Sequence, residues 1–127
     1  PSYEIKSDYG RVLDMVQDAL KRFPTGVYAV WYPIIPRPEA HDLPRRLKTL
    51  VQKAGKPWLH ATLTVKGGKA PAPTGDGQRR PGLPASGMFL ISPPFTLDAA
   101  LRQALPQMAE LLAQDRHATW TLEGGGS

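Results

Sequence analysis

Val27-Tyr28-Ala29-Val30-Trp31-Tyr32-Pro33-Ile34-Ile35 is the stretch that decides the fold class of this chain. The run is apolar at odd and even positions alike, which is the pattern of a strand buried on both faces. Such strands occur mainly in parallel sheets that carry helices on each side. Pro33 falls near the carboxyl end of the run, where a missing ladder donor is tolerated. The stretch therefore predicts an α/β fold with a parallel sheet around it.

Helices and further short strands are expected before and after this stretch in the chain. Apolar residues spaced by three and four predict the helices, and apolar residues spaced by two predict the strands. In chain order they are helix 7–23, strand 27–35, helix 43–54, strand 58–65, strand 88–92, helix 97–112 and an edge strand 119–122. Ser7 or Asp8, Asp42 and Thr96 are expected to cap the three helices. The strands 58–65 and 88–92 should form an antiparallel hairpin. This order suits the second half of an open α/β sheet.

The composition describes one globular domain with a moderately basic surface. At 127 residues, 41% of them hydrophobic, the chain can bury one core and no more. Its formal net charge of +5 favours polyanionic partners, nucleic acid first. A basic protein with no anionic partner is the alternative. Residues 1–123 are expected to form the domain and residues 124–127 a flexible Gly/Ser tail.

Several classes of site and location are disfavoured by what the sequence lacks. Without cysteine the chain has no disulfide, no Cys-ligated zinc and no thiol nucleophile, and it suits a reducing cytoplasm. No apolar run approaches the roughly 18 residues of a membrane span. His41, His60 and His117 stand alone without ligand spacing, so no metal site is expected.

Pro1-Ser2-Tyr3-Glu4 forms a proline–aromatic turn directly before the first helix. It matches the last three places of an Asp/Asn-Pro-Pro-Tyr turn, which holds an adenine for N6 methylation. The adenine amino nitrogen is a poor nucleophile because its lone pair is conjugated with the ring. A preceding carboxylate and the Pro1 carbonyl would accept its two hydrogens, while Tyr3 stacks on the base. Ligands of open α/β sheets bind beyond the carboxyl ends of strands, so Pro1–Tyr3 and Trp31–Pro33 would meet there. A proline turn that only leads into a helix is the alternative.

A second stretch, Ser92-Pro93-Pro94-Phe95, fits the same pattern and also follows a strand. Its structural interpretation is that the prolines end the strand while Phe95 packs against Ala99 or Ala100. A serine hydroxyl is also a weaker acceptor than a carboxylate. We therefore interpret this second turn as structural.

Basic residues lie in and beside the Gly- and Pro-rich loop 67–87. Lys66, Lys69, Arg79 and Arg80 are candidates for holding RNA phosphates. Simple solvation of these charges is the alternative. Gly67-Gly68-Lys69 lacks the spacing of a phosphate-binding loop and does not open a helix, so that function is rejected.

Two groups of motifs resemble the RlmJ (YhiR) family of bacterial 23S rRNA adenine-N6 methyltransferases. The first is Pro1-Ser2-Tyr3-Glu4 with Ser7-Asp8-Tyr9, then Lys21-Arg22-Phe23-x-Thr25-Gly26-x-Tyr28-Ala29-x-Trp31-Tyr32-Pro33. The second is Ala85-Ser86-Gly87-Met88 with Pro93-Pro94-Phe95. The resemblance runs from Pro1 to about Leu122 in order and spacing.

This resemblance implies the carboxyl half of a Rossmann-like class I methyltransferase that uses S-adenosylmethionine, needs no metal and acts on 23S rRNA. Pro1, Ser2 and Tyr3 would occupy the family's catalytic turn, with Ser2 in place of its second proline. Pro1 would also border the cofactor. The catalytic Asp and the main cofactor loop would precede Pro1, so the chain alone is expected to be inactive. A non-catalytic RNA-binding domain is the alternative, and an unpaired sheet edge would promote self-association.

Overall fold

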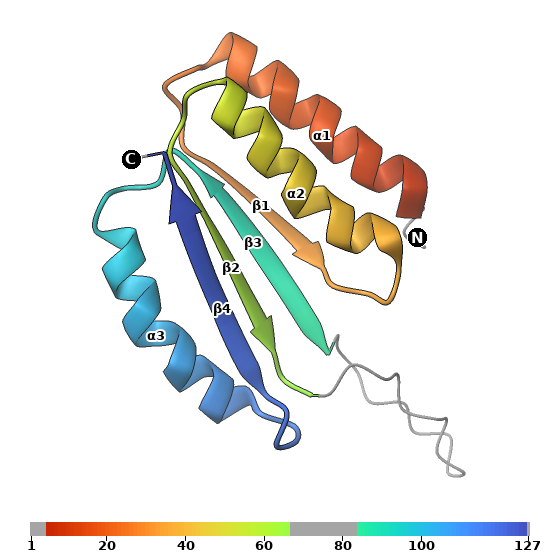
Figure 1. Cartoon of the computed structure of the whole chain (residues 1–127), viewed down its shortest axis with the longest axis vertical. Coiled ribbons are helices and arrows are strands. Elements are labelled where there is room, and N and C mark those ends of the chain that lie inside the picture. The colour runs from red at the N-terminus through yellow and green to blue at the C-terminus, as the bar shows by residue number, and fades with distance from the viewer. Residues whose placement is uncertain (1–4, 67–83, 127) are drawn as a thin grey trace.

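The computed structural model describes residues 5–66 and 84–126 of the chain. In this part the elements are α1 (Ile5–Arg22), β1 (Tyr28–Pro33), α2 (Pro38–Lys53), β2 (Trp58–Thr64), β3 (Ala85–Ile91), α3 (Leu97–Leu112) and β4 (Thr119–Gly125). Figure 1 shows α1 and α2 side by side on one face of the sheet and α3 on the other. None of these helices is long and apolar enough to cross a membrane.

The four strands of the described part form one sheet in the order β1-β3-β2-β4. The predicted α/β class is confirmed, and so is the hairpin, since β2 and β3 pair antiparallel over their whole length. The expectation that β1 lies in a parallel sheet is wrong for these residues, because β3 lies between β1 and β2 and runs against both. β1 and β2 point the same way but do not pair.

The starts of α1 and α2 lie earlier in the chain than predicted. α1 already begins at Ile5, so Asp8 lies in its first turn rather than at its cap. Thr96 does precede α3, but its side chain makes no capping hydrogen bond.

The start of α2 also lies earlier than predicted, at Pro38 rather than Leu43. Proline suits the first position of a helix because the N–H it lacks would have no partner there. Asp42 therefore lies inside α2, where its carboxylate accepts a hydrogen bond of 2.6 Å from Arg45 instead of capping the helix.

The larger hydrophobic core lies between the sheet and the helices α1 and α2. Its buried members are Tyr9, Val16, Leu20, Tyr32, Ala40, Leu43, Leu47, Val51, Trp58, Phe89 and Ile91. Successive strand residues alternate between the two faces. Leu59, Ala61 and Leu90 accordingly belong to the opposite face, where α3 contacts β4 and β2.

The α3 face of the sheet is only partly covered. Trp31 on β1 and its cross-strand partner Met88 on β3 are 56% and 38% exposed. β1 is thus buried on both faces only at Tyr32 and Pro33, and the expected continuous burial is wrong. Because β1 is also an edge strand of the described sheet, self-association of the chain along this edge stays a prediction.

The carboxyl-terminal glycines extend β4 beyond the expected boundary. Gly124 and Gly125 pair with Leu59 and Trp58, so they form part of the sheet rather than of a flexible tail. A side chain at position 124 would meet Leu59 at 2.7 Å and the Trp58 carbonyl at 2.9 Å. Glycine at this position allows β4 to lie close to β2. Interpreting these glycines as a flexible linker misses this structural role.

Candidate functional site

The end of β1 meets the start of α1 at one edge of the sheet (Figure 1). The Tyr9 hydroxyl donates a buried hydrogen bond of 2.9 Å to the Pro33 carbonyl, and the Tyr9 side chain is 3% exposed. The Ile34 N–H donates to the Ala85 carbonyl at 3.0 Å, which places the start of β3 at the same edge. We call this end of the sheet the site edge, as distinct from the lateral edge formed by the strand β1. At the site edge β1 and β2 end, and β3 and β4 begin.

The residues predicted to form the catalytic turn, Pro1, Ser2 and Tyr3, lie outside the described residues. The helix that follows them is described: α1 begins at Ile5 and is attached to the site edge through Tyr9. The expected meeting of the turn with Trp31–Pro33 therefore stays a prediction. The described contact that follows the turn in the chain is the hydrogen bond from Tyr9 to Pro33.

Of the four candidate RNA contacts, only Lys66 is among the described residues. The other three, Lys69, Arg79 and Arg80, lie outside them. Lys66 lies two residues beyond the end of β2 and is only 9% exposed, which leaves little of its side chain accessible to a phosphate. The Val65 N–H donates to the Pro84 carbonyl at 2.8 Å, so both ends of the intervening segment emerge together at the site edge.

The second Pro-Pro turn lies at the opposite edge. Ile91, the residue before it, pairs with Tyr28 and Trp58, the first residues of β1 and β2. Ser92–Phe95 is therefore separated by the length of the strands from the junction of Tyr9 with Pro33. The position of this turn favours a structural role.

One structural expectation for that turn is nevertheless wrong. Phe95 is 95% exposed and does not pack against Ala99 or Ala100. Ser92 has φ of 55°, a left-handed conformation that costs a residue with a side chain about 1–2 kcal/mol. Its N–H donates to the Pro57 carbonyl at 2.8 Å, and this bond helps to hold the strained turn at the end of β3.

A polar network that sequence reasoning missed crosses the core behind the site edge. The hydroxyl of Tyr32 on β1 lies 2.5 Å from Nε2 of His60 on β2. The Tyr32 ring reaches His60 across Gly87 of the intervening β3, and a Cβ at position 87 would lie 2.3 Å from that ring. Glycine at this position is what lets two strands that do not pair share a side-chain contact.

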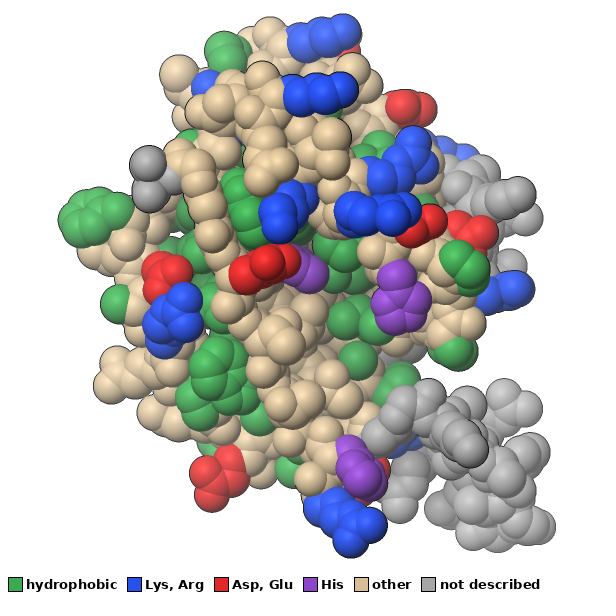
Figure 2. Space-filling view, viewed as in Figure 1, with side chains coloured by type: hydrophobic (Ala, Val, Ile, Leu, Met, Phe, Trp, Pro, Cys, Tyr) green, Lys and Arg blue, Asp and Glu red, His purple; other side chains and the backbone are tan. Residues whose placement is uncertain are grey.

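The network continues from His60 to charged groups at the surface. Nδ1 of His60 lies 3.8 Å from the Glu123 carboxylate on β4, and Nζ of Lys48 on α2 lies 3.9 Å from the same carboxylate. Because a carboxylate only accepts, the tautomer with its proton on Nδ1 suits both contacts, leaving Nε2 to accept from Tyr32. Figure 2 shows basic side chains gathered over α2 with acidic side chains among them.

The burial of Tyr32 and the partial burial of His60 keep both side chains neutral near pH 7. Desolvation raises the pKa of the Tyr32 hydroxyl above its usual value, and the proximity of Tyr9 adds to the rise. Desolvation lowers the pKa of the His60 imidazole; Glu123 opposes this effect, and Lys48 adds to it. The network therefore serves as a neutral, hydrogen-bonded support rather than a buried charge.

We expect the free energy of unfolding to fall as the pH is lowered from about 7 to about 5. The pKa of His60 in the folded protein lies below its ordinary value of 6.5, so the unfolded chain takes up a proton that the folded protein refuses. The stability contributed by neutral His60 is present above pH about 6.5 and is lost below it. Urea unfolding at several pH values measures the slope. His60→Asn should flatten it, whereas His117→Asn at an exposed position should not; identical slopes in all three proteins would contradict the assignment.

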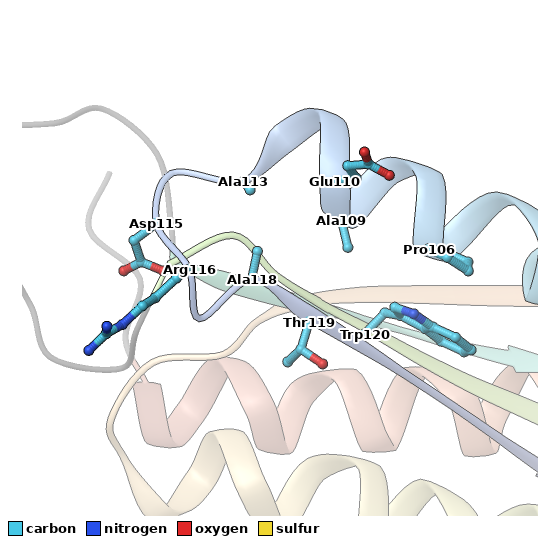
Figure 3. A pocket seen from close by; sticks show the side chains of 9 residues that line it. All are labelled: Pro106, Ala109, Glu110, Ala113, Asp115, Arg116, Ala118, Thr119 and Trp120. Carbon is cyan, nitrogen blue, oxygen red and sulfur yellow. The ribbon is translucent and has the colours of Figure 1, made fainter.

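A groove of about 420 Å³ opens between α3 and the start of β4. Figure 3 shows Thr119 and Trp120 on the strand, Ala109 on the helix above them, and Asp115 and Arg116 on the turn that joins the two elements. Thr119 pairs with Thr64 at the end of β2, so the groove opens at the site edge on the α3 face. No motif in the sequence marks it, because its walls come from residues without shared spacing. Among the described residues, no group of three His, Cys, Asp or Glu side chains could hold a metal ion.

The chain matches one protein-family model and two curated relatives of the same name. The family model described as "Ribosomal RNA large subunit methyltransferase D, RlmJ" matches residues 1–123. A Haemophilus influenzae protein named ribosomal RNA large subunit methyltransferase J is 36% identical over 97% of this chain and 40% of its own length. The Escherichia coli K12 protein of the same name is 33% identical over 94% of this chain and 39% of its own length. The chain thus spans about 40% of the length of these relatives.

The fold has a counterpart among solved structures. A crystal structure of a Legionella pneumophila protein superposes with a TM-score of 0.75 at 21% sequence identity. The match covers 98% of this chain and 41% of that one. The described sheet and helices therefore recur as one part of a larger folded protein.

Proposed function

Because this chain belongs to the RlmJ family of ribosomal RNA large subunit methyltransferases, we propose that it is the carboxyl part of a bacterial, cytoplasmic enzyme that methylates 23S rRNA. The reaction we propose is transfer of a methyl group from S-adenosylmethionine to the N6 amino group of an adenine. The observation that carries this proposal is the family match, which runs from the first residue to residue 123.

Pro1, Ser2 and Tyr3 are assigned to the turn that holds the target adenine. The Pro1 carbonyl and a carboxylate from the residue before it would accept hydrogen bonds from the amino group and turn its lone pair towards the methyl donor. Tyr3 would stack on the extruded base, an interaction worth roughly 1–3 kcal/mol. The attachment of α1 to the end of β1 supports this assignment, since ligands of open α/β sheets bind beyond the carboxyl ends of strands.

S-adenosylmethionine supplies the methyl group in this proposal. Within the chain only Pro1 is assigned to its binding. The other cofactor contacts are assigned to the part of the relatives' length that this chain does not cover, which we place upstream of Pro1. The chain alone should therefore bind the cofactor negligibly. Calorimetric titration that gave micromolar affinity for the chain by itself would contradict this placement.

The test of the proposed function is methyl transfer by the protein that includes the upstream region. Labelled S-adenosylmethionine and a 23S rRNA fragment should give N6-methyladenine with that protein and none with the 127-residue chain. Binding of the RNA without any transfer by the longer protein would instead favour the alternative, a non-catalytic RNA-binding domain.

Arg79 and Arg80 are proposed to hold rRNA phosphates, with Lys69 adding positive charge. Lys66 is the weaker candidate because it is 9% exposed. Arg79→Ala/Arg80→Ala in the longer protein should weaken RNA binding and reduce the log–log salt slope by somewhat under one unit for each lost contact. The matched control is Lys21→Ala/Arg22→Ala, an exposed basic pair at the far end of α1. Equal salt slopes for both double variants and the parent would show that the loop charges are only solvated.

A further inference from the structure

Tyr9 joins two elements at the point where the proposed site begins. It lies about one turn into α1, and its hydroxyl donates to the carbonyl of Pro33, the last residue of β1, at 2.9 Å. The bond is buried, and the Tyr9 side chain is 3% exposed. A buried hydroxyl held in this way fixes the first turns of α1 relative to the end of the strand.

The carbonyl that Tyr9 binds faces the outer side of β1. The N–H of the next residue, Ile34, donates to Ala85 on β3. Backbone groups of successive strand residues point to opposite edges, so the Pro33 carbonyl points away from β3. β1 is an edge strand in the described sheet, and proline offers no N–H on that side. The Tyr9 hydroxyl therefore occupies the place at the end of β1 where a neighbouring strand would otherwise donate.

Fixing the start of α1 limits where Tyr3 can lie. In the sequence only Glu4 separates Tyr3 from Ile5, the first residue of α1. A misplacement of about 1 Å in a methyl-transfer geometry can cost about a hundredfold in rate. Tyr9 is thus placed to affect the reaction without touching the substrate.

The support for Tyr9 extends into the core. The Tyr9 hydroxyl lies close enough to Tyr32 to raise its pKa, and Tyr32 is held in turn by His60. Tyr9 therefore rests against the buried network that crosses β3 rather than against solvent.

We propose that Tyr9 is a positioning residue of the methyl-transfer site. Its hydroxyl sets the place of the Pro1–Tyr3 turn relative to the site edge by holding α1 to the end of β1. This inference rests on the proposed function and adds to it a residue that makes no contact with adenine or cofactor.

The chain offers a matched control at the other end of the same two elements. The hydroxyl of Tyr28, the first residue of β1, donates to the carbonyls of Ala19 at 3.0 Å and Phe23 at 2.6 Å, at the end of α1. Tyr28 and Tyr9 thus make the same kind of bond between α1 and β1. Only Tyr9 makes it at the site edge.

The experiment compares Tyr9→Phe with Tyr28→Phe in the protein that includes the upstream region. Both variants keep the ring and lose one hydroxyl, so both should melt at somewhat lower temperatures. Only Tyr9→Phe should lower kcat, by about tenfold, with the Kd for S-adenosylmethionine unchanged. kcat is expressed per cofactor-binding molecule, so a partly unfolded preparation does not imitate the effect.

Two results would overturn the inference. One is an unchanged kcat in Tyr9→Phe, and the other is an equal loss of kcat in both variants, which would indicate general loosening of α1. An inactive parent protein would count against the proposed function instead, so the two failures are distinguishable.

Discussion

Gly87→Ala is expected to destabilise the folded protein by about 3 kcal/mol, at the upper end of what overpacking of a core usually costs. The added Cβ would lie 2.3 to 2.5 Å from three atoms of the Tyr32 side chain, two in the ring and the hydroxyl oxygen. Tyr32 is 2% exposed, so its ring has little room to move aside. Urea unfolding monitored by circular dichroism measures the change.

Gly10→Ala is the matched control for this substitution. Gly10 lies inside α1, and a Cβ there would meet nothing within 4 Å. The same chemical change should therefore stabilise the protein by up to about 1 kcal/mol through helix propensity. If Gly87→Ala were as harmless as Gly10→Ala, the result would contradict the close contact of the Tyr32 side chain with Gly87 on β3. A Tyr32→Ala background should remove most of the cost of Gly87→Ala, because the two changes share one contact.

Tyr3→Ala should lower methyl transfer by the protein that includes the upstream region by about fivefold to somewhat over a hundredfold. The reason is loss of base stacking, worth roughly 1–3 kcal/mol, where each 1.4 kcal/mol is about tenfold. Affinity for S-adenosylmethionine should hardly change, since Tyr3 is assigned to the base. Single-turnover rates and cofactor titration measure the two quantities separately.

Phe95→Ala is the control for Tyr3→Ala, because Phe95 holds the aromatic place of the second Pro-Pro turn. Phe95 is 95% exposed and lies at the edge of the sheet opposite Pro33. Both the rate and the melting temperature should stay near those of the parent protein. A large loss of rate in Phe95→Ala and none in Tyr3→Ala would make the second turn the catalytic one.

Local patterns in the sequence predict the helices and most strands, because each depends on residues close together in the chain. The stripe with Val16 and Leu20 marks α1, and the alternation after Trp58 marks β2. The partner of β1 could not be predicted in this way. Its apolar run favoured parallel neighbours, but the insertion of β3 is decided by contacts more than fifty residues away in the sequence.

Prediction of the site was limited in a similar manner. The turn at Pro1–Tyr3 is predicted from its residue types, because they carry a chemical meaning of their own. The Tyr9 bond to Pro33 and the Tyr32–His60 pair join residues with no common spacing, so only the folded chain brings them together. Gly87 in isolation looks like a weak strand residue, and its use becomes visible only when the Tyr32 ring is seen to lie over it.

The strand order β1-β3-β2-β4 has a consequence for how the chain folds. Pairing β3 with β2 closes a loop of about 20 residues, whereas pairing β3 with β1 closes one of about 50, which costs roughly 0.8 kcal/mol more in chain entropy. Assembly is therefore favoured from the hairpin outward, with β1 and the helix attached to it among the later parts to join. Pulse-labelled hydrogen exchange should protect the amides of β2 before those of β1. β1, the strand whose end lies beside the start of α1, is thus among the last strands to join the sheet.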